Sequence, residues 1–190
     1  CMMENLGLLD SMIAIASYRE SLSYYCVPEL VKQEKAFLES EDMYHPMLEN
    51  PVANTIKEER GVLVTGSNAS GKSTFLKTVA ISAVFAQTIH TCPARQYRTC
   101  YFQIYSSMAL KDNLQGNESY YIVEIKSLKR ILNRVEEKTP LLCFVDEVLR
   151  GTNTIERISA SAQILKSLAK VHVMCFAATC LLYTSPSPRD

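Results

Sequence analysis

Eight consecutive residues in the first half of the chain have the types and spacing needed to hold phosphate. Gly66 to Ser73 read Gly-Ser-Asn-Ala-Ser-Gly-Lys-Ser, which fits the pattern G-x-x-x-x-G-K-[ST]. The glycines let the backbone close around a phosphate group, to which loop N–H groups and a helix N-terminus present positive potential. Lys72 could reach β- and γ-phosphates, and the Ser73 hydroxyl could bind Mg²⁺. The pattern therefore predicts a site for a nucleoside triphosphate with Mg²⁺.

The residues on both sides of this loop favour the same interpretation. Val62–Thr65 is a short apolar, β-branched run and predicts a buried strand. Apolar residues then recur at helical spacing, which predicts a helix from about Ser73 to Gln87: Phe75, Leu76, Val79, Ala80, Ala83 and Val84. A Gly/Ser-rich loop that only caps a helix is the alternative. The order strand, loop, helix favours a P-loop NTPase.

A second segment that could contribute to a catalytic site follows Pro140. The apolar residues Leu141–Val145 end in Asp146 and Glu147, as a Walker B strand does. In a parallel sheet such a strand is buried, and its acids emerge at the C-terminal edge where ligands bind. Asp146 would hold the Mg²⁺ shell, and Glu147 would orient and polarise the attacking water. The alternative is that the two acids only cap the next turn. The phosphate-binding pattern upstream makes this alternative the weaker one.

The remaining pattern predicts an α/β fold, with a mostly parallel sheet flanked by helices. We expect a helix over residues 6–23, ended by Pro28, and then a polar segment to Glu39. Pro46 and Pro51 predict extended chain or an edge strand over 44–54, where His45 is expected at the surface with no metal role. Further elements are expected downstream: a strand at 101–105, a helix at 119–138 with Ser119 as its N-cap, a helix after Thr154 and a strand at 171–178.

Composition sets wide bounds on function. The chain has 190 residues, of which 47% are hydrophobic and 21% charged, as in an ordinary soluble domain. The formal net charge is zero, which neither indicates nor excludes a nucleic-acid partner. Seven cysteines without C-x-x-C spacing predict reduced structural thiols, and the sequence has no signal peptide or long apolar run. We therefore expect a cytoplasmic protein.

Several segments together resemble the MutS-type mismatch repair ATPases. Thr65–Thr74, with Asn68 two places after Gly66, is similar to the P-loop of that family. Asp146 and Glu147 precede Arg150–Thr154 (Arg-Gly-Thr-Asn-Thr), where the family has R-G-T-S-T. Other resemblances are those of Ser119–Ile125 to the segment S-T-F-M-V-E-M, of His45-Pro46 to the start of the ATPase domain, and of Leu9–Ala16 to the end of the lever helix. The resemblance covers about residues 6–179.

The resemblance implies a homodimer whose ATP sites are shared between two ATPase domains. The implied nucleotide-binding residues in cis are Gly66, Ser67, Asn68, Ala69, Ser70, Gly71, Lys72, Ser73 and Thr74. Ser119 would approach the γ-phosphate of the partner's nucleotide, Asn68 would sense phosphate or nucleotide, and Lys72 and Glu147 would be catalytic. ATP binding and hydrolysis, with Mg²⁺ on Ser73 and Asp146, would drive clamp movements on duplex DNA, which other domains contact.

The resemblance also implies the division of the chain. Residues 1–40 would end a helical lever or connector, and 41–179 would form the ATPase domain, truncated at its C-terminus. Residues 180–190 resemble translated vector sequence and are expected to be non-native.

Two departures from the family pattern leave other functions open. Ala178-Thr179-Cys180 stands where the family has A-T-H, and the loop Asp112–Asn117 differs from the usual mismatch repair version. That loop is more similar to a divergent bacterial branch, some members of which carry membrane helices and lack a mismatch-reading domain. One alternative is therefore a nucleotide-gated scaffold or membrane-associated switch. Another is an ABC-type ATPase, although no L-S-G-G-Q-like signature precedes the Walker B run.

Overall fold

The computed structural model describes residues 2–67, 70–108, 120–146 and 154–179. Its elements are, in chain order, α1 (Met2–Ser21), β1 (Glu29–Val31), β2 (Leu38–Met43), β3 (Asn54–Glu58), β4 (Val62–Thr65), α2 (Lys72–Thr88), β5 (Gln96–Cys100), β6 (Gln103–Ser107), α3 (Tyr120–Arg134), β7 (Leu141–Asp146), α4 (Thr154–Ser167) and β8 (Val173–Thr179). The predicted strands and helices around the loop are all present. The strand expected at 101–105 lies two residues later, in β6.

A parallel sheet of order β4-β8-β7-β6 forms the centre of the molecule. Val62 pairs with Phe176, and Asp146 pairs with Ala178. Because the strands are parallel, their C-terminal ends meet at one edge. The loop after β4 and the acid at the end of β7 therefore lie at the same edge, separated by β8 alone. The α/β fold with a parallel sheet and flanking helices is confirmed.

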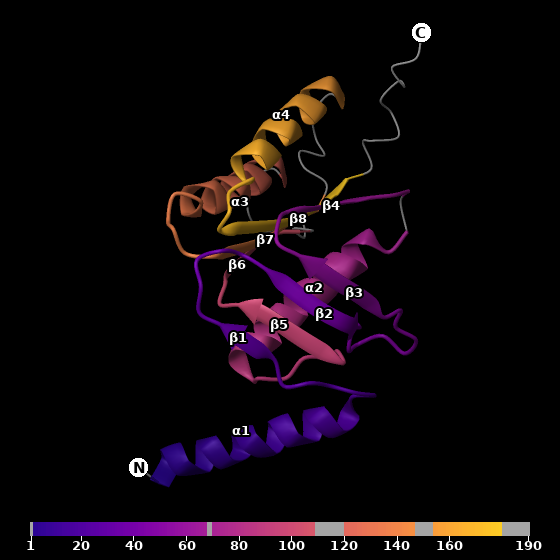
Figure 1. Cartoon of the computed structure of the whole chain (residues 1–190), viewed down its shortest axis with the longest axis vertical. Helices are drawn as coiled ribbons and strands as arrows, with labels where there is room; N and C mark the ends of the chain where they lie inside the picture. The colour runs from indigo at the N-terminus through magenta and orange to yellow at the C-terminus, as the bar shows by residue number, and fades with distance from the viewer. Residues whose placement is uncertain (1, 68–69, 109–119, 147–153, 180–190) are drawn as a thin grey trace.

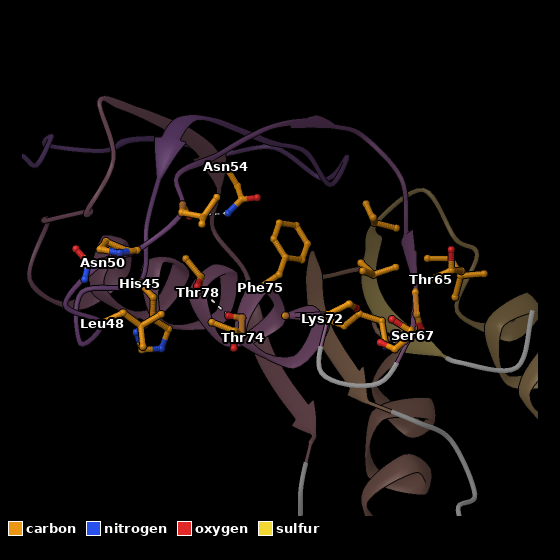
Figure 2. A pocket seen from close by; sticks show the side chains of 18 residues that line it. His45, Leu48, Asn50, Asn54, Thr65, Ser67, Lys72, Thr74, Phe75 and Thr78 are labelled. Carbon is orange, nitrogen blue, oxygen red and sulfur yellow. Dashed lines mark hydrogen bonds between the residues drawn. The ribbon is translucent and has the colours of Figure 1, made fainter. Parts of the chain in front are cut away.

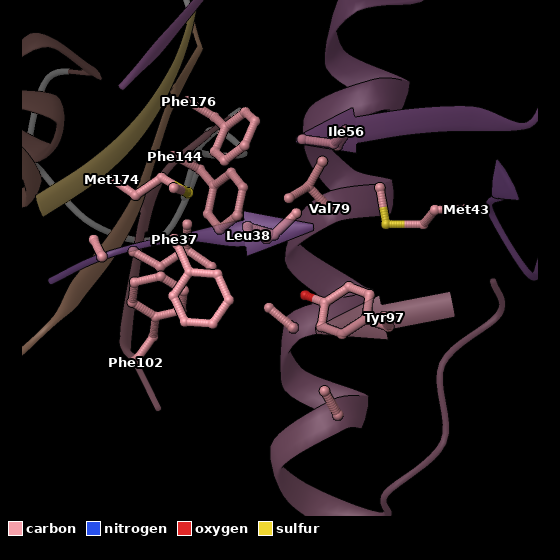
Figure 3. Packing of buried hydrophobic residues seen from close by; sticks show 14 of the residues in the cluster. Phe37, Leu38, Met43, Ile56, Val79, Tyr97, Phe102, Phe144, Met174 and Phe176 are labelled. Carbon is pink, nitrogen blue, oxygen red and sulfur yellow. The ribbon is translucent and has the colours of Figure 1, made fainter. Parts of the chain in front are cut away.

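Each face of this sheet packs into its own core. α2 covers one face, and α3 and α4 lie on the other (Figure 1). All six residues of β7 are buried, and the five apolar ones, Leu141–Val145, alternate between the two cores. Phe144 and Phe176 lie next to each other on the α2 side (Figure 3), where their rings stack with centroids 5.7 Å apart. Cys143 and Cys175 lie on the other side, where hydrogen bonding with Cys175 and burial raise the pKa of the Cys143 thiol.

A second sheet, of order β1-β5-β2-β3, covers the far side of α2 and was not predicted. Its pairings are antiparallel apart from the parallel pair β1–β5. A row of alternating charges crosses all four strands. Arg98 lies between Glu29 and Glu39, and Lys57 contacts Glu39 on the next strand. Opposite charges in register favour this strand order.

The helix α1 extends beyond the second sheet, and none of its residues is buried (Figure 1). Its C-terminal end contacts the end of α2, where Arg19 donates hydrogen bonds to Thr91 Oγ1 (2.8 Å) and to the His90 carbonyl (3.1 Å). The boundary expected at residue 40 falls inside β2. The predicted division into lever and ATPase domain stays a prediction. None of the helices in the described ranges combines the length and apolar character of a membrane span.

Replacement of a core aromatic should separate buried from exposed apolar residues in their effect on stability. Phe176 is fully buried, so Phe176→Ala should lower the free energy of unfolding by about 3–5 kcal/mol through lost burial and a cavity. Val171 is 69% exposed, and Val171→Ala should change the free energy of unfolding by less than about 0.5 kcal/mol. Urea denaturation of both variants measures the two values. Equal losses would contradict the described core.

Candidate functional site

The loop between β4 and α2 turns sharply into the helix. Gly71 is the N-cap of α2 and has φ of +88°, in the left-handed region that favours glycine. Its carbonyl accepts the first hydrogen bond of the helix, from the Phe75 N–H at 2.9 Å. The N-terminus of α2 thus points its unpaired N–H groups toward the loop.

The side chain of Lys72 lies inside the curve of this loop. Lys72 is the first residue of α2 and is only 8% exposed. Its ammonium donates hydrogen bonds to the carbonyl oxygens of Gly66 (2.8 Å) and Ser67 (2.5 Å). A buried ammonium needs acceptors, and the loop carbonyls supply them here. The positive charge is therefore held where an anion in the loop would meet it.

A hydrogen bond joins the first turn of α2 to the end of β7. The Ser73 hydroxyl donates to Asp146 Oδ2 at 2.6 Å, although the two residues are 73 positions apart in the chain. Asp146 is 8% exposed, and the hydrogen bond satisfies one of its oxygens. A hydroxyl and a carboxylate are oxygen ligands of the kind that Mg²⁺ prefers.

These two oxygens do not make a complete metal site. Within the described ranges, no three His, Cys, Asp or Glu side chains gather closely enough to hold a metal ion. Mg²⁺ usually keeps several waters and is held by one or two carboxylates together with substrate phosphates. The pair Ser73–Asp146 therefore fits a cation that arrives with a phosphate ligand.

A pocket of about 900 Å³ extends from the loop along α2 to the segment before β3. Figure 2 shows Ser67 and Lys72 at one end of it and His45 and Asn50 at the other, with Phe75 between them. The volume is in the range of small-molecule sites. The lining role of residues 45–54 was missed, because proline and asparagine there predicted only extended chain. The position of this segment just before the loop strand was the available signal.

The structure brings together most of the residues predicted for the site. Six of the residues predicted to bind nucleotide line the pocket: Gly66, Ser67, Ser70, Gly71, Lys72 and Thr74. The two predicted metal ligands, Ser73 and Asp146, contact each other. The other predicted residues lie outside the described ranges: Asn68, Ala69, Ser119 and Glu147. Their roles stay predictions.

The chain is similar in sequence to known proteins. The family model of MutS domain V matches residues 62–185. The MutS protein homolog 4 of Mus musculus is 33% identical, over 88% of this chain and 18% of the relative. The DNA mismatch repair protein MutS of Methanosarcina acetivorans is 30% identical, over 93% of this chain and 20% of the relative. The DNA mismatch repair protein MutS of a Thermotoga species is 32% identical, over 88% of this chain and 21% of the relative.

The chain spans about a fifth of the length of these curated relatives. The match to MutS domain V covers more than half of the chain and includes β4, the loop, α2, β7 and β8. The chain therefore belongs to the MutS family.

Proposed function

We propose that this chain is a P-loop NTPase domain that binds ATP or ADP with Mg²⁺ and hydrolyses ATP. The observation that carries the proposal is the hydrogen bond between Ser73 and Asp146, beside the buried ammonium of Lys72. Lys72 and Ser73 begin α2 and Asp146 ends β7, and Lys72 lines the pocket beside the loop. Membership of the MutS family supports the same proposal, because the matched region is domain V.

The loop would bind the phosphates. Its carbonyls hold the Lys72 ammonium at 2.5 and 2.8 Å, so an entering phosphate would replace them as the partner of this charge. The helix N-terminus after Gly71 adds N–H donors and a favourable dipole. Lys72 would reach the β- and γ-phosphates and stabilise negative charge on them during transfer.

Ser73 and Asp146 would hold Mg²⁺ between the loop and β7. Their oxygens lie 2.6 Å apart and belong to chemical classes that bind this ion. When bound, Mg²⁺ would neutralise charge on the β- and γ-phosphates. The Ser73 hydroxyl would then turn its lone pairs to the cation, and Asp146 would no longer accept a hydrogen bond from it.

Hydrolysis would depend on the residue after Asp146. Glu147 would accept a hydrogen bond from the attacking water and orient it, which is the role predicted from the sequence. We propose further that Ser119 of a second copy approaches the γ-phosphate, so that two copies form a homodimer with composite sites. Asn68 and Ala69 would complete the loop around the phosphates.

The far half of the pocket would take the base and ribose. Leu48, Val52 and Phe75 offer apolar surface there, and Asn50 and Asn54 offer amide groups. A nucleotide needs apolar contact for the base and a few placed polar groups for orientation. The pocket thus has an anion-binding half and a half suited to a planar ring.

In the whole protein we propose that ATP binding and hydrolysis drive clamp movements on mismatched DNA, as part of mismatch repair. Two of the relatives are named DNA mismatch repair proteins, which supports this role. Other domains would contact the duplex. A scaffold without mismatch recognition and an ABC-type ATPase are not favoured, because the match is to a MutS domain. The divergent bacterial branch and the cytoplasmic localisation stay predictions.

Removal of the buried ammonium should strongly reduce ATP turnover. Lys72→Ala takes away the positive charge at the phosphates and should lower turnover about 10²–10³-fold. Release of phosphate from Mg²⁺-ATP measures the rate, and calorimetry measures ATP affinity. Lys77→Ala, on the exposed face of the same helix, is the matched control and should change neither value. Equal turnover in the Lys72 and Lys77 variants would contradict the assigned role.

Neutralisation of the buried carboxylate should weaken the response to Mg²⁺. Asp146→Asn keeps the size of the side chain but removes its charge, so the Mg²⁺ concentration needed for half-maximal turnover should rise about 10–100-fold. A Mg²⁺ titration of ATP turnover gives this midpoint. Asp42→Asn changes an exposed carboxylate paired with Arg95 and serves as the control. An unchanged midpoint in Asp146→Asn would refute the assigned ligand.

A further inference from the structure

The outer face of α3 carries a stripe of basic residues, which we call the α3 stripe. It consists of Lys126, Lys129, Arg130, Asn133, Arg134 and Glu137, which together line a shallow surface depression. The five members from Lys126 to Arg134 lie on one side of α3, at spacings of three and four residues, and Glu137 follows the end of the helix. Four of the six members are cations and one is an acid, so the stripe is strongly positive in a chain whose formal net charge is zero.

The opposite face of α3 packs against the core. Leu128, Ile131 and Val135 are buried against β7 and β8. α3 lies on the side of the parallel sheet away from α2, and no member of the stripe lines the nucleotide pocket (Figure 1). The stripe is therefore a surface separate from the proposed ATP site.

Two arginines of the stripe have described contacts within the fold. Arg134 forms an ion pair with Glu137, and the Arg130 guanidinium lies over the Tyr105 ring, 5.7 Å from its centroid. These contacts orient the two arginines, while the stripe keeps an excess of positive charge. A stripe in which four of six side chains are cationic is the electrostatic footprint of a polyanion site.

The dimensions of the stripe fit a nucleic-acid backbone. Lys126 to Arg134 covers about 12 Å along the helix axis at 1.5 Å per residue. Each strand of duplex DNA presents one phosphate per about 3.4 Å of the duplex axis, so roughly three or four phosphates of one strand face a stripe of this length. Several cations could then contact phosphates at the same time.

Two other partners fit less well. Protein interfaces need an apolar centre, and no member of the α3 stripe is apolar. Membrane-surface helices bury an apolar face in the lipid, but the apolar face of α3 is already buried in this domain. The exposed Ile122 and Ile125, near the start of the helix, are too few for such an anchor.

We propose that the α3 stripe binds the phosphate backbone of duplex DNA, independently of base sequence. This contact would belong to the ATPase domain itself and would add to those made by other domains. It does not depend on nucleotide binding at the loop. Its affinity should fall with salt, because each neutralised phosphate releases counterions.

The test measures binding of the chain to a short fluorescent DNA duplex, without nucleotide, over a series of KCl concentrations. Lys126→Gln/Lys129→Gln removes two exposed cations of the stripe, so the slope of log affinity against log salt should decrease by about 2. Lys126→Arg/Lys129→Arg keeps both charges and should keep the slope. The control Lys32→Gln/Lys57→Gln removes two exposed cations from the second sheet and should also leave it unchanged.

The outcomes separate this proposal from its alternatives. A second duplex of unrelated sequence should give the same slopes, and ATP turnover should be the same in all variants. An unchanged slope in the Gln variant of the stripe, or an equal decrease in the control, would overturn the proposal. The proposal would also be overturned if Lys126→Gln/Lys129→Gln lost binding to vesicles of phosphatidylcholine and phosphatidylserine but still bound DNA as the unmodified chain does. That result would identify a membrane surface instead.

Discussion

The site depends on the parallel alignment of β4, β8 and β7. This alignment places the end of β4 and the end of β7 at one edge, one strand apart, and the Ser73–Asp146 hydrogen bond of 2.6 Å spans that gap. Residues 73 positions apart in sequence thereby meet within a single hydrogen bond. If β8 were absent or reversed, neither the loop nor the carboxylate would lose its sequence pattern, but Ser73 and Asp146 would no longer meet.

The packing on both faces of the sheet fixes this alignment. β7 is buried along its whole length, and its apolar side chains alternate between the core under α2 and the core under α3 and α4. α2 is also covered by the second sheet, so the helix that begins at Lys72 is held on two sides. A helix and a buried strand held in this way can carry a buried ammonium, which costs free energy unless acceptors surround it.

Much of this arrangement could be predicted from the sequence, since strong local patterns carry it. The loop pattern, the apolar run before Asp146 and the helical periodicity of α2 each follow from neighbouring residues. The second sheet could not be predicted in this way. Ser40 and Thr99 are buried in β2 and β5, so polar residues occupy the inner face and hide the alternation typical of a strand. The part of the pocket formed by residues 45–54 was missed for a related reason, because its shape depends on tertiary contacts with α2 rather than on a local pattern.

The measurement that tests the central claim most directly compares ATP binding and turnover in the unmodified chain and in Glu147→Gln. We expect both to bind Mg²⁺-ATP with similar affinity, because the loop, Lys72, Ser73 and Asp146 are unchanged. Turnover should fall about 10²–10⁴-fold in the variant, because the amide cannot act as a base toward the attacking water. Absence of ATP binding in the unmodified chain, or equal turnover in the two proteins, would contradict the proposed ATPase.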